Sequence, residues 1–372
     1  MHIPDGFLDA KTIAATGVLA AAGLGTAVHK MRLQSEPRRV PVTGLLAAFL
    51  FAAQMLNFPV AGGTSGHLIG AVLAVVLVGP WAATTAIAAV LILQCFLFAD
   101  GGVTALGANV FNMAVLAPAV GCAVYSPLRR FISGTRGILF AAAFAAWVSV
   151  VAASVACAGE LAASGTVAWK VAFPAMAGVH MLIGLGEAAI TALVLATVAR
   201  LRPELLKSDS PAKDYGAAAL QGLLVALGLA IFIAPFACGW PDGLEKVAAR
   251  LGFASAEGPL LHAPLPQYSI PGIHWTGLST ALAGAAGTLA AFALSYFLSK
   301  ALTREVTTVQ ELFSLPRLRG RVGERANRSM NPPLSRPSDT LAPPSKSIPV
   351  GEAFLASPLP RKRGREESSE FK

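Results

Sequence analysis

The chain opens on Met1-His2, a dipeptide whose atoms can chelate a transition metal. A free terminal amine, the backbone amide nitrogen of His2 and its imidazole can hold one divalent ion in fused five- and six-membered rings. The amide must lose its proton, which Ni(II), Cu(II) and, less readily, Co(II) can bring about. Three nitrogens in one plane favour tetragonal or square-planar coordination. The released proton predicts that metal affinity falls with acidity.

A glycine-rich segment supplies a candidate fourth nitrogen ligand, His67. It reads Gly62-Gly-Thr-Ser-Gly-His-Leu-Ile-Gly and lies between two apolar runs. Irregular backbone at membrane depth is tolerated where it lines a cavity or is buried in protein. For His67 alone, metal ligation and helix capping through a backbone carbonyl are equal alternatives.

Four further polar residues are candidates for supporting roles. Asp100 and Asn109 lie in one glycine-rich stretch and can hold loops by hydrogen bonds or orient a ligating imidazole. His180 and Glu187 lie seven residues apart in one apolar segment. A carboxylate within a membrane span is a functional candidate by default, although bonding to neighbouring helices is a strong alternative for Glu187.

The composition requires that these residues be positioned by membrane helices. Hydrophobic residues make up 55% of the 372 residues and charged residues 13%, about half the charged fraction of a typical soluble domain. We therefore expect an all-α integral membrane protein in a lipid bilayer. The net charge of +9 does not indicate a nucleic-acid partner, because the basic residues lie in short loops and in the C-terminal tail.

Apolar segments of membrane-spanning character predict about nine helices. The third and fourth are short and are divided by Gly79-Pro80, so they are either two short helices or one broken span. The segments are 10–29, 40–57, 67–79, 82–98, 106–126, 137–158, 171–199, 216–236 and 277–299.

Charge in the loops predicts the orientation of this bundle. Lys and Arg follow the first, fifth, seventh and ninth segments, which places those loops in the cytoplasm and the N-terminus outside. The leader before the first segment has no positive region, so we expect no signal cleavage and a retained Met1. Residues 313–372 are rich in Pro, Ser, Arg and Gly, which predicts a disordered, basic cytoplasmic tail.

Three motifs resemble the CbiM/NikM family, the substrate-binding membrane subunits of energy-coupling-factor nickel and cobalt transporters. The resemblance covers about residues 1–200 and implies metal ligation by the amine of Met1, the amide and imidazole of His2, and His67. The motifs are Met1-His-Ile-Pro-Asp-Gly-Phe-Leu, Gly62-Gly-Thr-Ser-Gly-His-Leu and Phe98-Ala-Asp-Gly-Gly-Val-Thr-Ala-Leu-Gly-Ala-Asn-Val-Phe-Asn-Met.

A second resemblance covers about residues 215–299. Gly239-Trp-Pro-Asp-Gly-Leu-Glu and Ala263-Pro-Leu-Pro-Gln-Tyr are similar to the PDGLE module of NikN/CbiN-type accessory subunits, two helices that flank an outer loop. Gln267 stands where that module usually carries Asp. His262 and His274 lie in the same loop, where solvated side chains are more usual than metal-handling ones. The chain thus resembles a fusion of the two subunits.

The resemblance implies an ATP-driven importer of Ni(II) or Co(II), the latter for cobalamin biosynthesis, in the bacterial inner membrane. The sequence contains no GxxxxGK[ST] phosphate-binding motif, so a transmembrane coupling (T) protein and separate ABC-type ATPase subunits are the implied partners. Two other classes remain open. One is a membrane metalloenzyme using His67, His180 and Glu187, although HExxH is absent; the other is a metal-binding sensor or scaffold.

Overall fold

A computed structural model of the protein describes residues 2–34, 39–206, 215–256, 258 and 260–303. These residues form one compact, mainly helical unit. The predicted tail, 313–372, and Met1 lie outside them. The helices are α1 (Ala10–Gln34), α2 (Val40–Gln54), α3 (Ala71–Val78), α4 (Pro80–Phe98), α5 (Leu106–Asn109), α6 (Ala117–Phe131), α7 (Gly134–Ala163), α8 (Trp169–Leu201), α9 (Tyr215–Gly228), α10 (Gly243–Leu251) and α11 (Thr276–Leu302).

Seven helical stretches of the described residues are long and apolar enough to cross a membrane. They comprise α1, α4, α7, α8 and α11, the run from α5 through a π-helical segment (Val110–Leu116) to α6, and the run from α9 to Phe236. Large apolar side chains such as Leu193, Leu224 and Phe297 are exposed on them. Such faces suit lipid rather than water, so the protein is a multi-pass membrane protein.

The remaining two apolar segments form shorter helices. α2 has 15 residues and α3 only 8, so the structure does not confirm a count of nine spans. The expectation that the fourth segment is also short was wrong: α4 has 19 residues. Gly79, with φ of 84°, separates α3 from α4, and Pro80 begins α4 because proline has no N–H to contribute to the first turn.

A small antiparallel sheet departs from the all-α expectation. β1 (Phe58–Val60) pairs with β2 (Thr64–Gly66), with Phe58 opposite Gly66. Gly62 and Gly63 both have positive φ in the connecting turn, a conformation that glycine adopts without steric cost. The hairpin ends immediately before His67.

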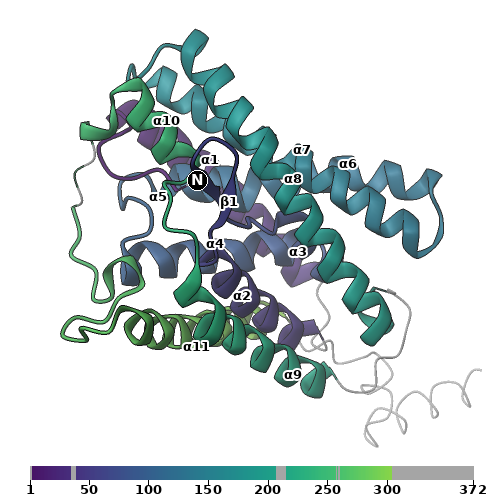
Figure 1. The fold of residues 1–372 in the computed structure, drawn as a ribbon. Coiled ribbons are helices and arrows are strands. Elements are labelled where there is room, and N and C mark those ends of the chain that lie inside the picture. Colours follow the sequence, from purple (N-terminus) through teal and green to yellow (C-terminus); the bar gives the residue numbers. More distant parts are fainter. Residues whose placement is uncertain (1, 35–38, 207–214, 257, 259, 304–372) are drawn as a thin grey trace, which may run out of the picture. The chain divides into compact units, whose positions relative to one another are not determined.

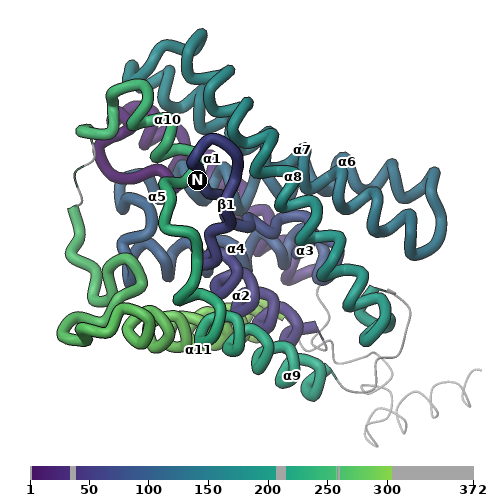
Figure 2. Tube along the Cα trace, in the orientation of Figure 1, coloured from purple at the N-terminus to yellow at the C-terminus, as the bar shows by residue number. Residues whose placement is uncertain are grey.

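The helices pack around a buried α2, and the C-terminal region returns to the N-terminus. Figure 1 shows α7 and α8 side by side, and α2 near α9 and α11, in agreement with their contacts. Figure 2 shows the chain rising after α9 to α10, beside the N-terminus, and then returning to α11. The excursion between α9 and α11 therefore lies at the end of the bundle that carries His2.

Candidate metal centre

The N-terminal leader, residues 2–9, is clamped by a buried asparagine. The backbone N–H of Ile3 donates to Oδ1 of Asn109 at 2.7 Å, and Nδ2 of Asn109 donates to the Ile3 carbonyl at 3.0 Å. The N–H of Gly102 donates to the same carbonyl at 2.9 Å. The Ile3 side chain is fully buried. This arrangement fixes the backbone next to His2.

A second anchor holds the leader at Asp5. Thr104 donates to Oδ1 of Asp5 through its N–H (2.8 Å) and its hydroxyl (2.6 Å). Burial acts to raise the pKa of Asp5, but these hydrogen bonds outweigh it and lower the pKa. A Cβ on Gly102 would lie 2.2 Å from the Asp5 nitrogen, so only glycine lets the leader approach this loop so closely.

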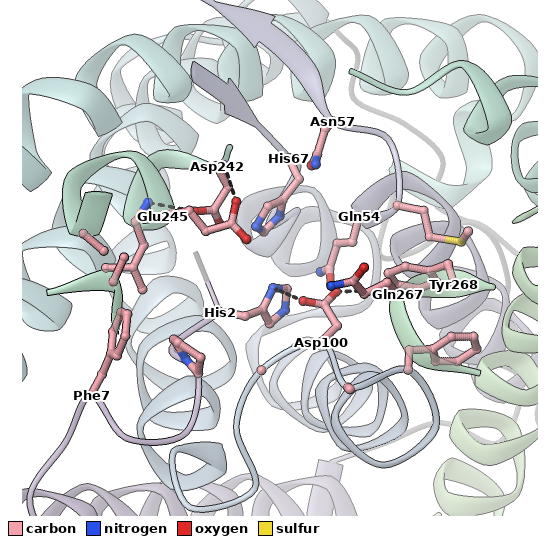
Figure 3. Close-up of a pocket in the computed structure, with 18 residues that line it drawn as sticks. His2, Phe7, Gln54, Asn57, His67, Asp100, Asp242, Glu245, Gln267 and Tyr268 are labelled. Atoms are coloured by element: carbon pink, nitrogen blue, oxygen red, sulfur yellow. Dashed lines mark hydrogen bonds and ion pairs between the residues drawn. The ribbon is translucent and has the colours of Figure 1, made fainter. Parts of the chain in front are cut away.

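His2 and His67 lie face to face in the cavity shown in Figure 3. Their ring centroids are 5.1 Å apart and their planes differ by 17°. With metal–nitrogen bonds of about 2 Å, two imidazoles on one ion have centroids roughly 4.5 to 6.5 Å apart. Both side chains are nearly buried, at 8% and 7% exposed. Their separation falls in this range, but an imidazole binds a metal in the plane of its ring, so the stacked rings must turn before both can hold a single ion.

The two nitrogens of His2 differ in their surroundings. Nδ1 lies 3.0 Å from Oδ1 of Asp100, whereas Nε2 is buried without a hydrogen-bond partner among the described residues. Burial acts to raise the pKa of Asp100, but the attraction of His2 and the hydrogen bonds from His2 and Tyr268 outweigh it. The pKa is held well below its usual range, so this carboxylate contributes negative charge to the cavity.

The hairpin carries His67 into the cavity and is tied to the region beyond α9. The N–H and hydroxyl of Ser65 donate to the carbonyls of Pro241 (2.8 Å) and Trp240 (2.7 Å), and the Thr64 hydroxyl donates to Pro241 at 3.1 Å. Burial lowers the pKa of His67 to about 3. The imidazole is therefore neutral at neutral pH, which is the form that binds metals.

Glu187 of α8 supports the backbone just beyond His67. Its two carboxylate oxygens accept hydrogen bonds from the N–H groups of Ile69 (2.7 Å) and Gly70 (2.8 Å), at the start of α3. All three residues are buried. A carboxylate is favourable here because these two buried N–H groups, just before α3, need an acceptor and because the N-terminal end of the α3 dipole attracts negative charge.

Glu187→Leu is expected to lower the free energy of unfolding by roughly 2 to 5 kcal/mol, because two buried N–H groups lose their acceptor. Chemical denaturation of the purified protein in detergent measures this loss. Glu187→Gln retains one acceptor oxygen and should lose less. Equal stability of Glu187→Leu and the parent chain would contradict this role.

The region beyond α9 supplies one wall of the His2–His67 cavity, which has a volume of about 330 Å³. Asp242, Glu245, Gln267 and Tyr268 line it. Figure 3 shows Asp242 near His67 and Tyr268 near Asp100. Asp242 also caps the N-terminus of α10, since its Oδ1 accepts hydrogen bonds from the N–H groups of Leu244 and Glu245.

Sequence reasoning did not single out Asp242 or Tyr268 as cavity residues. Both residues lie in motifs that the sequence assigns to an accessory module, Trp240-Pro-Asp-Gly-Leu-Glu and Pro264-Leu-Pro-Gln-Tyr. These motifs indicate the module but do not predict that its loop lines the cavity. Gln94 of α4 donates to the Tyr268 hydroxyl at 3.1 Å.

His180 does not line this cavity, although it lines a much smaller pocket of about 10 Å³ together with His67. Its Nδ1 is 2.8 Å from the Met176 carbonyl, and a Cβ on Gly243 would lie 2.7 Å from its Cε1. His180 thus packs against the start of α10. His262 and His274 are exposed and do not line the cavity.

The structure thus sorts the predicted site residues into two groups. His2, His67 and Asp100 line one cavity, whereas Asn109 and Glu187 hold the two backbone segments that carry the histidines. A metalloenzyme site of His67, His180 and Glu187 is disfavoured, because both Glu187 oxygens are engaged by backbone N–H groups. The cavity brings two imidazoles and several carboxylates together, but no three His, Cys, Asp or Glu side chains among the described residues are placed to hold one metal ion. A metal site here therefore needs further donors, such as the expected nitrogens of the N-terminus.

Comparison with known proteins matches both halves of the chain. Residues 2–205 match the CbiM family, described as the cobalt uptake substrate-specific transmembrane region, and residues 216–304 match the PDGLE domain. The Archaeoglobus fulgidus protein named NikMN is 37% identical over 303 residues, covering 81% of this chain and 98% of its own length.

Two further relatives share this layout. The fused nickel transport protein NikMN of Rhodobacter capsulatus is 34% identical, covering 82% of this chain and 99% of its own length. The LarMN protein of Lactiplantibacillus plantarum is 33% identical over 75% of this chain and 87% of its own length. The resemblance to the M and N subunits is confirmed, and the chain belongs to the CbiM family in its fused form, with a PDGLE domain after the CbiM region.

Proposed function

We propose that this protein is the substrate-binding subunit of a nickel uptake transporter. The observation that carries the proposal is the pair His2 and His67. Their nearly buried rings have centroids 5.1 Å apart and line one cavity at one end of a membrane bundle. The leader that bears His2 is clamped in place by Asn109. Residues far apart in the sequence are therefore arranged around one cavity.

In this proposal the ion is the transported substrate. The amine of Met1, the amide and imidazole of His2 and the imidazole of His67 form a planar four-nitrogen set, which suits Ni(II). Several fused relatives of this chain carry nickel in their names, whereas the matching family is described by cobalt uptake. We accordingly place Ni(II) first and Co(II) second.

The proposed transport cycle needs further subunits. A transmembrane coupling protein and ABC-type ATPases would supply the energy, in the bacterial inner membrane. The N-terminus would face outward, with nine helical segments: a seven-segment metal-binding domain (1–200) and a two-segment accessory module (215–299), followed by a tail (313–372). The ion would enter from outside, exchange its water for the nitrogen ligands, and leave inward when the partners drive the bundle open.

The test is uptake of radioactive nickel and cobalt by cells that make this chain together with its coupling and ATPase subunits. We expect uptake to require the chain and an intact ATPase, and to favour nickel over cobalt. Cells lacking only this chain are the matched control. Equal uptake with and without the chain would reject the transport function, and equal rates for both ions would reject the preference.

A further inference from the structure

The accessory module reaches the His2 ligand through a chain of hydrogen bonds. The hydroxyl of Tyr268 donates to Oδ2 of Asp100 at 2.5 Å, and Oδ1 of Asp100 lies 3.0 Å from Nδ1 of His2. Nε2 of Gln94 donates to the same hydroxyl at 3.1 Å, which orients it. We call the set Tyr268, Asp100 and His2 the latch.

The contact with Asp100 uses Nδ1 of His2, the same nitrogen that the proposed chelate would use to bind the ion. The six-membered ring of the proposed chelate contains the ion, the His2 amide nitrogen, Cα, Cβ, Cγ and Nδ1. Nε2 is too far from the amide nitrogen to close such a ring. The Asp100 contact and the chelate therefore compete for Nδ1, and only one of them can form at a time.

The backbone of the latch is strained at Tyr268 and beside Asp100. Tyr268 and the preceding Gln267 have φ of 58° and 49°, and Ala99, next to Asp100, has φ of 53°. Among the described residues these are the only non-glycine residues with positive φ. Strain of this kind persists only where surrounding structure enforces it, and it clusters at sites that switch or bind ligands.

The surroundings of Tyr268 show what enforces this conformation. Its ring stacks on Phe98 with centroids 4.8 Å apart and lies 5.9 Å from Phe51. The N–H of Leu265 donates to the Leu97 carbonyl at 2.9 Å, which ties the loop to the end of α4. The ring is thus anchored in the core while its hydroxyl acts on Asp100.

We propose that Tyr268 is a positioning residue of the metal site, which holds Asp100 on Nδ1 of His2 and thereby sets the resistance to metal loading. The inference rests on the proposed chelation by His2. Because coupling between sites is reciprocal, an ion that takes Nδ1 weakens the hold of Tyr268 on Asp100 and loosens the Tyr268 loop at that contact. The accessory module would then sense loading through its own loop as well as forming the cavity wall.

Tyr268→Phe tests the latch, since it keeps the ring packing and removes only the hydroxyl. Nickel titration of the purified full-length chain should show a dissociation constant lowered about threefold to tenfold, as expected for the loss of one ordinary hydrogen bond, and faster loading in stopped flow. Tyr296→Phe, the same change within α11, is the matched control and should leave both quantities unchanged.

Hydrogen exchange over residues 262–273 gives a second readout that a purely structural role would not move. We expect nickel to increase exchange there in the parent chain, and Tyr268→Phe to increase it without nickel. Unchanged or weaker nickel binding by Tyr268→Phe, or slower exchange of this loop with nickel, would overturn the latch. If His2→Ala leaves nickel binding intact, the proposed site itself fails, which is a separate outcome.

Discussion

Replacing His2 with alanine is expected to weaken nickel binding by more than about 100-fold. Loss of an outer hydrogen-bond partner of a metal ligand already costs 10- to 100-fold in affinity, and His2 would supply the ligand itself. The change removes the imidazole whose ring centroid lies 5.1 Å from that of the His67 ring. Nickel titration of the purified chain measures the dissociation constant, and uptake by cells should fall in parallel.

His262→Ala is the matched control, because His262 is exposed and does not line the cavity. A second variant separates the amine from the imidazole. Adding Met-Leu in front of Met1 keeps His2 but turns the proposed amine ligand into an amide. We expect this extension to weaken binding about as much as His2→Ala does. Full affinity in the extended chain would exclude the amine, and full affinity in both variants would exclude the N-terminal site.

The sequence predicted the helices well where an apolar run is long, because roughly 20 apolar residues have few alternatives to a membrane helix. It predicted the break at Gly79-Pro80 but not that α3 would begin only at Ala71, which leaves α3 with 8 residues beside the 19 of α4. The hairpin before His67 was also missed, although its turn glycines are a recognised local signal.

The candidate site was predictable only in part, because local motifs reveal some of its residues while others are brought there by the tertiary fold. His2, His67, Asp100 and Asn109 lie in short motifs whose residue types already suggest chemistry. Tyr268 contacts Asp100 across a separation of 168 residues, and no local pattern encodes such a contact. The left-handed conformation of Gln267 and Tyr268 is equally hidden, because neither residue type signals a positive φ. That conformation depends on the tertiary fold.

Asn109→Ala is expected to weaken nickel binding about 10- to 100-fold without touching a proposed ligand. The substitution removes both hydrogen bonds to Ile3 and leaves its buried N–H without an acceptor, at a cost of about 1–3 kcal/mol. Each 1.4 kcal/mol corresponds to tenfold in affinity. Because His2 is adjacent to Ile3, detachment of the leader moves the proposed chelate away from His67.

The control for this prediction lies three residues further along the chain. Asn112 is also buried, but its Nδ2 donates to Glu160 at 2.7 Å rather than to the leader. Asn112→Ala should therefore lower stability while changing the nickel dissociation constant less than Asn109→Ala does. Asn109→Asp, which keeps the acceptor for the Ile3 N–H but loses the donor, should fall between the alanine variant and the parent chain. Equal losses of affinity in both alanine variants would show that general destabilisation, and not the position of the leader, controls the site.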